Sequence, residues 1–222
     1  MITTLAEIKQ RSRERSNMEG SDFVTDTELT TYINSSLAEL HDLLVATYGP
    51  DYYVSSYEFT TNNTTADYTL PADFYKLKGV DIAVGGGEYD SLRPFNFNER
   101  NRASVGALGL RYRLVDDTIR FSPKPDGNYN IKLWYIPSVT KLVEDTDTFK
   151  DINDYVEYVV VDVAIKMLLK EESDASALQG AKMALKERIE KMAPNRDAEQ
   201  PESISDIYAE SGDYTRRNNG GY

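Results

Sequence analysis

The chain has 222 residues, 40% of them hydrophobic and 28% charged, which are ordinary proportions for a globular protein with a hydrophobic core. Its formal net charge of −12 opposes non-specific binding to nucleic acid or an anionic membrane. It has no cysteine, so disulfides, thiolate zinc sites and cysteine nucleophiles are excluded. No run of residues approaches the ~18 apolar residues of a membrane span, and the N-terminus lacks a signal-peptide core. We expect a soluble protein made in the cytoplasm.

Two helices are predicted before residue 51, over residues 3–18 and 25–48. Each begins with a capping box, in which a threonine and a glutamate three residues later bond unpaired backbone amides of the first turn. The pairs are Thr4 with Glu7 and Thr25 with Glu28. Apolar residues recur at three- and four-residue steps in the second helix, which predicts one continuous buried face. Gly20 and Gly49 are expected to end the two helices.

The pattern changes to β structure in residues 51–150. Strands are predicted over residues 51–59, 80–84, 110–115, 118–121 and 129–136. Gly85-Gly86-Gly87 and Asp116-Asp117 are predicted to form hairpin turns. Prolines flank the last strand, which favours short, edge-like strands. We expect an inserted antiparallel β-rich sheet or a small, partly open barrel.

Helices are predicted again over residues 151–170, with Asp151 as N-cap, and over residues 175–193, which Pro194 ends. The helix predicted over residues 175–193 has one apolar face, formed by Leu178, Ala181, Leu185, Ile189 and Met192. The fold class is therefore α+β. It comprises a helical bundle of two N-terminal helices (residues 1–50) and two C-terminal helices (residues 151–193), with the β-rich insert between them.

Residues 194–222 are predicted to form an extended C-terminal tail, because they carry six acidic residues and little apolar content. Within it Ile204, Ile207 and Tyr208 share helical spacing. These three residues are our first candidate for docking on a neighbouring protein. The alternative is a free, solvated tail.

Residue types that carry catalysis or bind metals are sparse. The single histidine, His41, lies beside an apolar helix face without a Gly-x-Ser-x-Gly motif, so we expect no catalytic role. The glycine run lacks the Lys-Ser or Lys-Thr of a phosphate-binding loop. The best cation candidates are Asp145, Asp147, Asp151 and Asp154, but they fail the EF-hand spacing, and a helix N-terminus explains the last two better. We predict no enzymatic activity, no cofactor and no metal site.

Arginines concentrate in two places. Arg11, Arg13 and Arg15 end the first helix, where positive charge suits the helix dipole, and they are our second, weaker candidate for assembly. In the insert, Arg111 and Arg113 alternate on one strand and so share a face. The other arginines of the insert are Arg93, Arg100, Arg102 and Arg120. The stripe lacks the aromatic density of a nucleic-acid-binding face, so we interpret it as a salt-bridged face against an acidic neighbour.

Several phrases, taken in their order, resemble the head–tail connector (adaptor) proteins of tailed bacteriophages. They are the Tyr-Thr-Leu-Pro-Ala-Asp-Phe of residues 68–74, the strand and Pro-x-Pro-x-Gly turn of residues 118–127, the Leu-Trp-Tyr-Ile-Pro of residues 133–137, and Asn195-Arg196-Asp197 followed by Pro201 and Asp206. The resemblance covers roughly residues 22–208. The tail after Tyr208 matches no part of that family's pattern.

The resemblance implies a non-catalytic virion subunit in a homo-oligomeric ring, commonly of twelve copies, seated under the portal protein. C-terminal segments would reach into the portal, and tail or nozzle proteins would bind the opposite face. DNA would only pass through the channel, whose lumen the net negative charge could line. No membrane contact is implied.

Two other classes of function remain open at this point. One is a carbohydrate- or receptor-binding virion module, motivated by a chain with sixteen tyrosines, many in the β-rich region. An aromatic platform on one sheet face would favour it. The other is a hydrolase with an unrecognised carboxylate site, which a deep pocket holding two acids in unlike surroundings would favour.

Overall fold

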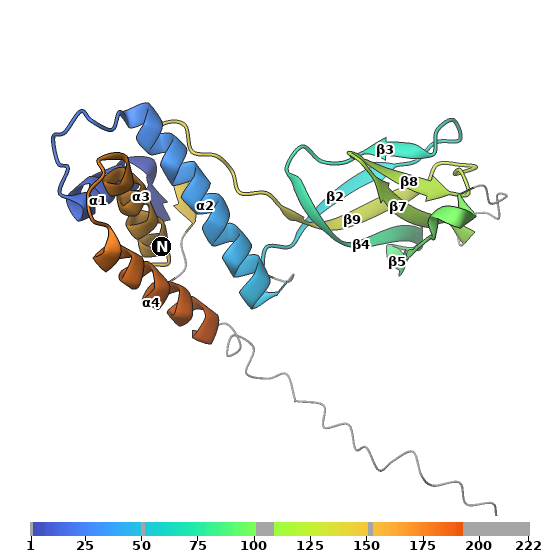
Figure 1. The fold of residues 1–222 in the computed structure, drawn as a ribbon. Helices are drawn as coiled ribbons and strands as arrows, with labels where there is room; N and C mark the ends of the chain where they lie inside the picture. Colours follow the sequence, from blue (N-terminus) through green and yellow to red (C-terminus); the bar gives the residue numbers. More distant parts are fainter. Residues whose placement is uncertain (1, 50–51, 101–108, 151–152, 193–222) are drawn as a thin grey trace, which may run out of the picture.

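A computed structural model describes residues 2–49, 52–100, 109–150 and 153–192. The described chain is α+β, with the helices gathered at one end and most of the strands at the other (Figure 1). Helices α1 (Leu5–Ser16) and α2 (Asp26–Tyr48) precede the strands, and α3 (Val156–Lys170) and α4 (Ser176–Met192) follow them. The chain therefore leaves the helical part once and returns to it once.

Both predicted capping boxes are confirmed. The hydroxyl oxygens of Thr4 and Thr25 accept the backbone N–H groups of Glu7 and Glu28, whose carboxylates accept the N–H groups of the two threonines. Gly20 was expected to end α1, but Asn17 ends it in the left-handed region, with φ of 56°. An asparagine tolerates this conformation because its short polar side chain bonds locally.

Helix α1 also begins two residues later than predicted, because residues Ile2–Thr4 form the short strand β1. Strand β1 pairs antiparallel with β10 (Thr148–Lys150), which follows the last strand of the sandwich. The pairing brings the start of the chain to the point where it re-enters the helical part. A contact between segments so far apart in sequence leaves no local pattern to read.

The two C-terminal helices differ from the prediction at their boundaries and faces. Helix α3 begins at Val156 with Tyr155 as its N-cap residue, whereas Asp151, the predicted N-cap, lies outside the described residues. In α4 only Ile189 is fully buried, with Leu178 and Leu185 half-buried. Ala181 and Met192, which we assigned to the same face, are exposed. The half-buried Lys182 takes part of the contact stripe instead, for a reason given below.

Helix α3 is the centre of the helical part, because it contacts each of the other three helices. Ten of its fifteen residues are buried, including the valine run at residues 159–161. These valines favour strands by propensity, but burial on several helix faces outweighs that preference. The apolar face of α2 packs into the same core, formed by Leu29, Ile33, Leu37, Leu40 and Leu44.

The strands form two packed sheets rather than the single sheet or small barrel that we predicted. One sheet has the order β2 (Ser55–Thr60), β9 (Asn130–Pro137), β4 (Phe74–Gly85), β5 (Glu88–Ser91), and all its pairs are antiparallel. The other has the order β3 (Asp67–Thr69), β8 (Thr118–Ser122), β7 (Arg111–Val115), β6 (Arg93–Pro94), with the pair β6–β7 parallel.

The two sheets share one hydrophobic core, so the β part is a sandwich. Its buried members come from both sheets and from the approach to β7: Val80, Ile82, Leu110, Ile119, Phe121, Ile131, Leu133 and Tyr135. They alternate along β4, β8 and β9 with outward-facing residues, as expected for strands with one buried face.

Two strand predictions were wrong in an instructive way. Strand β9 is eight residues long and central, although flanking prolines favoured an edge strand. Pro137 is its last residue, where a missing N–H does not interrupt the ladder. Strand β2 begins at Ser55, not at residue 51, because Tyr52 and Tyr53 pack against the helical core. The glycine hairpin is confirmed, with positive φ at all three positions of residues 85–87.

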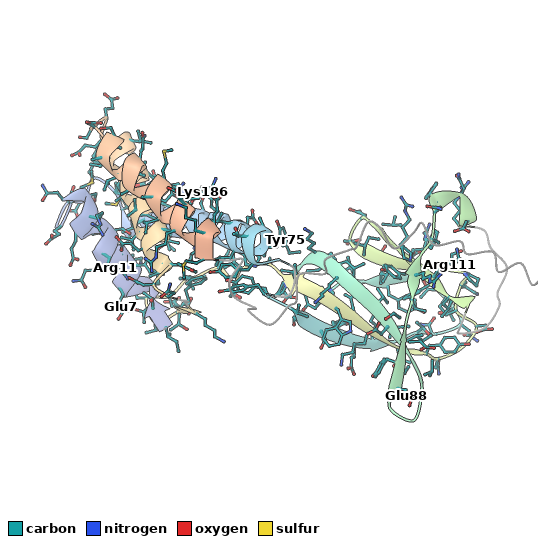
Figure 2. All side chains as sticks on the ribbon, turned by 90° about the horizontal axis from the view of Figure 1, so that it is seen from below. Glu7, Arg11, Tyr75, Glu88, Arg111 and Lys186 are labelled. Atoms are coloured by element: carbon teal, nitrogen blue, oxygen red, sulfur yellow. The ribbon has the colours of Figure 1, made fainter. Side chains whose placement is uncertain are left out.

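An aromatic junction joins the helical part to the sandwich. Buried His41 of α2 stacks on Tyr53 at a ring-centroid distance of 4.8 Å and meets the edge of Tyr75 at 5.7 Å. Tyr75 is on β4 and donates its hydroxyl to Asp42 of α2, and this hydrogen bond raises the pKa of Tyr75. Figure 2 places Tyr75 beside α2, where the two parts meet. His41, for which the sequence predicted no catalytic role, is therefore a junction residue.

The segment that returns from the sandwich is tied to α2 by Asn34. The Asn34 side chain accepts the N–H of Leu142 and donates to its carbonyl oxygen, both at 2.8 Å. Leu142 itself is buried in the helical core. This side chain thus acts as a strand-like partner for a segment that has no ladder of its own.

Replacement of Leu37 by alanine should lower the free energy of unfolding by about 2–5 kcal/mol, because it leaves a cavity in the helical core. Chemical unfolding followed by circular dichroism measures this loss. Met183→Ala is the matched control, since Met183 is 73% exposed. Its effect should stay within about 0.5 kcal/mol. Equal losses in the two variants would contradict the packing described here.

The single histidine allows an unambiguous titration. Burial lowers the pKa of His41, and the partly opposing effects of Asp42 and the Pro137 carbonyl do not reverse it. Proton NMR should therefore show the one imidazole titrating below 6.5. Because the folded-state pKa is depressed, the associated stability is present above 6.5 and is lost as the pH falls through the folded pKa. His41→Phe should remove this pH dependence, and a midpoint at or above 6.5 would exclude burial as the dominant influence.

Candidate assembly surfaces

The tail residues proposed first for docking, Ile204, Ile207 and Tyr208, lie outside the described residues. Their role therefore stays a prediction. The structure describes the chain only up to Met192, the last residue of α4. The tail thus starts from the helical part of the molecule.

The arginines of α1 do not form one patch. Arg11 contacts Glu157 of α3 at 2.7 Å, and Arg15 pairs with the same carboxylate. Arg13 points elsewhere: its guanidinium donates to the carbonyl oxygens of Ser21 and Val24 and to Asp26, each at 2.9 Å.

Arg13 therefore holds the loop between α1 and α2 in place. Arg11 and Arg15 line a shallow depression of about 330 Å³ together with Glu157. Figure 2 shows Arg11 on the outer side of the helical part. An assembly role for these arginines remains a prediction, and the geometry restricts it to Arg11 and Arg15.

A buried carboxylate connects three helices. Asp162 of α3 is 5% exposed and accepts a hydrogen bond from Ser36 of α2 at 2.6 Å. Lys166 and Lys182 bind its two oxygens at 2.7 and 2.8 Å. Burial acts to raise the pKa of Asp162, but these three partners outweigh it and hold the pKa below its usual range. The residue is therefore a carboxylate at neutral pH.

Lys182 of α4 extends this network to Glu39 of α2, which it contacts at 2.8 Å. The Tyr158 hydroxyl donates to the same Glu39 oxygen at 2.9 Å. Burial, aided by Glu39, raises the pKa of Tyr158 to about 12. These bonds explain why a lysine occupies part of the contact stripe of α4, beside the buried Ile189 and the half-buried Leu178 and Leu185.

Glu39 and Asp162 also line an open depression of about 400 Å³. Two acids in unlike surroundings were the feature that would favour a hydrolase. A general acid needs a carboxyl group that is protonated near neutral pH, which requires a raised pKa. The Asp162 pKa is lowered, and both of its oxygens are taken by lysines. The arrangement favours a structural network over a catalytic pair.

Three of the four acidic residues considered for a cation site have other partners. Asp145 pairs with Lys9 at 2.7 Å, and Asp154 faces Arg11. The Asp147 carboxylate accepts the N–H groups of Val143 and Glu144, which lowers its pKa. Asp151 lies outside the described residues. Within the described part of the chain, no three acidic or histidine side chains are grouped as metal ligands.

The outer face of the sheet β2-β9-β4-β5 carries an aromatic cluster. The Lys132 ammonium lies 4.8 Å from the ring centre of Trp134 and 5.6 Å from that of Tyr89. Lys132 also pairs with Glu58 at 3.0 Å, and the Trp134 indole N–H donates to Asp81 at 2.7 Å. Lys132 thus lies over the ring faces on which a sugar would stack.

The outer face of the other sheet is an arginine face, which we define by Arg93, Arg100, Arg111, Arg113 and Arg120. Arg111 pairs with Glu99 at 3.2 Å, and Arg120 binds both oxygens of Asp67 at 2.6 and 2.8 Å. The hydrogen bonds from Arg120 lower the pKa of Asp67. Arg102 lies outside the described residues.

An exposed phenylalanine lies within the arginine face. Phe97 belongs to the short 3-10 helix η1 (Phe97–Glu99) and is 52% exposed. The guanidinium groups of Arg100 and Arg113 lie 4.8 and 5.7 Å from its ring centre. Sequence reasoning missed Phe97, because only the fold brings η1 against β7. The shared face of Arg111 and Arg113 was the one signal available.

No helix in the described ranges is long and apolar enough to cross a membrane. Comparison with known proteins gives one family: the family model described as SU10 adaptor protein matches residues 3–205. No curated protein sequence matches the chain significantly. A solved chain titled "Neck of empty GTA particle computed with C6 symmetry" is 15% identical, with 85% of this chain and 94% of that chain covered. Its TM-score of 0.32 is too low to support a conclusion about fold.

Asp162→Asn should lower the free energy of unfolding at pH 7 by about 3 kcal/mol, because it leaves two lysines without their buried partner. The wild-type contribution is fully present above pH 3.8, the ordinary carboxyl value, and is lost as the pH falls through the lower folded-state pKa. Unfolding curves across this range should therefore fall more steeply for the wild type than for the variant. Glu187→Gln, in an exposed pair with Lys191, is the matched control and should change little.

Proposed function

The chain belongs to the SU10 adaptor protein family, and from this membership we propose that it is a subunit of the ring that joins the head and tail of a tailed phage. The family is one of structural phage adaptors, so the chain is a structural component of the virion. The observation that carries the proposal is the extent of the match. Residues 3–205 include the helical part, the whole sandwich and the start of the tail.

The proposed ring contains identical copies, commonly twelve, seated under the portal protein. Cyclic rings need heterologous contacts, in which two different surfaces of each copy meet. The elongated arrangement in Figure 1 offers separate surfaces on the helical part and on the sandwich. We assign portal contact to the helical end, from which the tail starts, and contact with tail or nozzle proteins to the opposite end.

DNA would pass through the ring without being held. The net charge of −12 supports this, because acidic walls repel the phosphates of DNA. The moving DNA then has no attractive contacts with the wall to break. We propose no catalytic step. The hydrolase reading has no support from the Asp162 network, in which lysines hold the carboxylate in its charged form.

The carbohydrate-binding alternative is not favoured by the sandwich. It requires an open aromatic platform, but Lys132 lies over Trp134 and Tyr89. The remaining aromatic contacts of the sandwich include Phe59, Tyr68 and Phe121, which pack in or against the core between the sheets.

The proposed docking device is the tail, and its removal tests the proposal. A chain lacking residues 200–222 should lose binding to the portal of the same phage, with nearly unchanged helical content, because all four described helices end before residue 193. Co-sedimentation with portal measures binding, and circular dichroism measures helicity.

A finer variant keeps the tail and replaces Ile204, Ile207 and Tyr208 by serine. Its matched control replaces Ser203, Ser205 and Ser211 by glycine, so the same number of tail positions changes without loss of apolar surface. We expect at least tenfold weaker portal binding for the first and little change for the control. Undiminished binding by the truncated chain would rule out docking through the tail.

A further inference from the structure

We propose that the arginine face of one copy binds the acidic β4–β5 hairpin of the next copy in the ring. The inference rests on the proposed function, since it specifies which surfaces of the sandwich meet between neighbouring copies. It concerns a contact between neighbouring copies on the strand side of the molecule, away from the helices.

The arginine face carries uncompensated charge. Its five arginines face only two carboxylates among the described residues, Glu99 and Asp67, which are bound to Arg111 and Arg120. Across the described ranges, Arg93, Arg100 and Arg113 make no ion pair with an acid. The neighbouring Arg111 and Arg120 already bind carboxylates through their guanidinium groups, so the surface is suited to bind further carboxylates.

The face also has the composition of an interface centre. Arg100 and Arg113 flank the ring of Phe97, which is 52% exposed. Aromatic residues and arginines are the side chains that contribute most to binding between proteins. An isolated surface phenylalanine would need no explanation. Phe97, however, lies between two guanidinium groups that bond backbone carbonyl oxygens but pair with no acid in the described chain, so the three side chains form a combined apolar and cationic site.

The complementary surface is the β4–β5 hairpin. Glu88 and Asp90 are two residues apart on β5, so they share one side of that strand. All four residues of β5 are exposed, β5 is the edge of its sheet, and neither acid has an ion-pair partner within the described chain. Charges on an edge strand also discourage unwanted strand pairing, which explains an acidic edge but not the arginine face opposite.

The positions of the two surfaces fit a heterologous contact. Figure 2 shows Glu88 at the tip of the hairpin, which projects from the sandwich, and Arg111 among the strands, away from that tip. Among the described residues, neither Glu88 nor Asp90 pairs with an arginine of the face, whose ion pairs are those of Arg111 with Glu99 and Arg120 with Asp67. A second copy, placed alongside, presents an acidic hairpin to a basic face, and repetition of the contact generates a ring or a filament.

A second copy is favoured over nucleic acid as the occupant. The chain as a whole has a net charge of −12, which repels a polyanion approaching the arginine face. A neighbouring copy brings two carboxylates on a short, projecting hairpin instead of a continuous line of phosphates. The local charge contrast within one acidic chain is therefore most simply satisfied between copies.

Charge exchange tests the contact. The arginine variant carries Arg100→Glu and Arg113→Glu, and the hairpin variant carries Glu88→Lys and Asp90→Lys. Each should require an at least tenfold higher concentration for half-maximal assembly, alone or on the portal, measured by mass photometry. The control Lys186→Glu with Arg188→Glu changes two exposed cations of α4, at the end assigned to portal contact. It is therefore compared only in assembly without portal, where it should behave like the wild type.

Mixing gives the decisive result. Each variant should fail alone, but an equimolar mixture should assemble, because every Glu-substituted face then meets a Lys-substituted hairpin and every native face a native hairpin. The chain with all four substitutions should assemble for the same reason. If the glutamates disturb folding, Arg100→Gln with Arg113→Gln should still weaken assembly.

The outcomes separate the two proposals. If the wild type assembled and each variant alone assembled equally well, the proposed hairpin contact would be wrong, but the proposed ring would stand. If the two variants assembled neither alone nor in the mixture, the hairpin contact would also be wrong. Charge complementarity between the two surfaces would then not be the cause of assembly. A wild type that forms no oligomer, alone or with portal, would refute the ring and the contact together. If the wild-type chain bound duplex DNA more tightly than it bound itself, the arginine face would be assigned to nucleic acid instead.

Discussion

The burial of α3 is the constraint on which the helical part depends. A helix with ten of fifteen residues buried needs neighbours on most sides, and α1, α2 and α4 supply them. The cost of burying a carboxylate in this helix is offset by Ser36 from one neighbour and Lys182 from another. The same residue that would destabilise an isolated α3 therefore orients the helices around it, and α4 is held by a lysine as much as by its apolar side chains.

Electrostatics divides the molecule in a way that the overall charge conceals. The chain is strongly acidic, yet one sheet surface carries five arginines. In the helical part, basic side chains such as Lys9, Arg13 and Lys170 are paired with acids. On the arginine face, pairing is incomplete. Charge is thus used for internal stability at one end of the molecule, and it remains available for external contacts at the other.

Local signals in the sequence predicted the helices well and the sheets only in part. Thr4–Glu7 and Thr25–Glu28 are complete within four residues, so their capping boxes could be recognised without the fold. The pairing of β2 with β9, or of β3 with β8, joins residues at least 49 positions apart, and no local pattern encodes it. The place of His41 was missed for the same reason, since it stacks on Tyr53 and meets the edge of Tyr75 from a distant strand. The arginine face was half-visible: strand alternation paired Arg111 with Arg113, but Phe97 joins them only in three dimensions.

The pairing of β2 with β9 has a consequence for how this architecture can change over evolution. These are the first and last long strands of the sandwich, and they lie side by side, with Ser55 opposite Tyr135. Entry and exit of the insert are therefore neighbours, so the closure of the helical part does not depend on what lies between them. Such an insert behaves as a cassette. It can be lengthened, shortened or exchanged while the helical part keeps its fold. The sandwich can therefore adapt to new partners without changes to the packing of the helices.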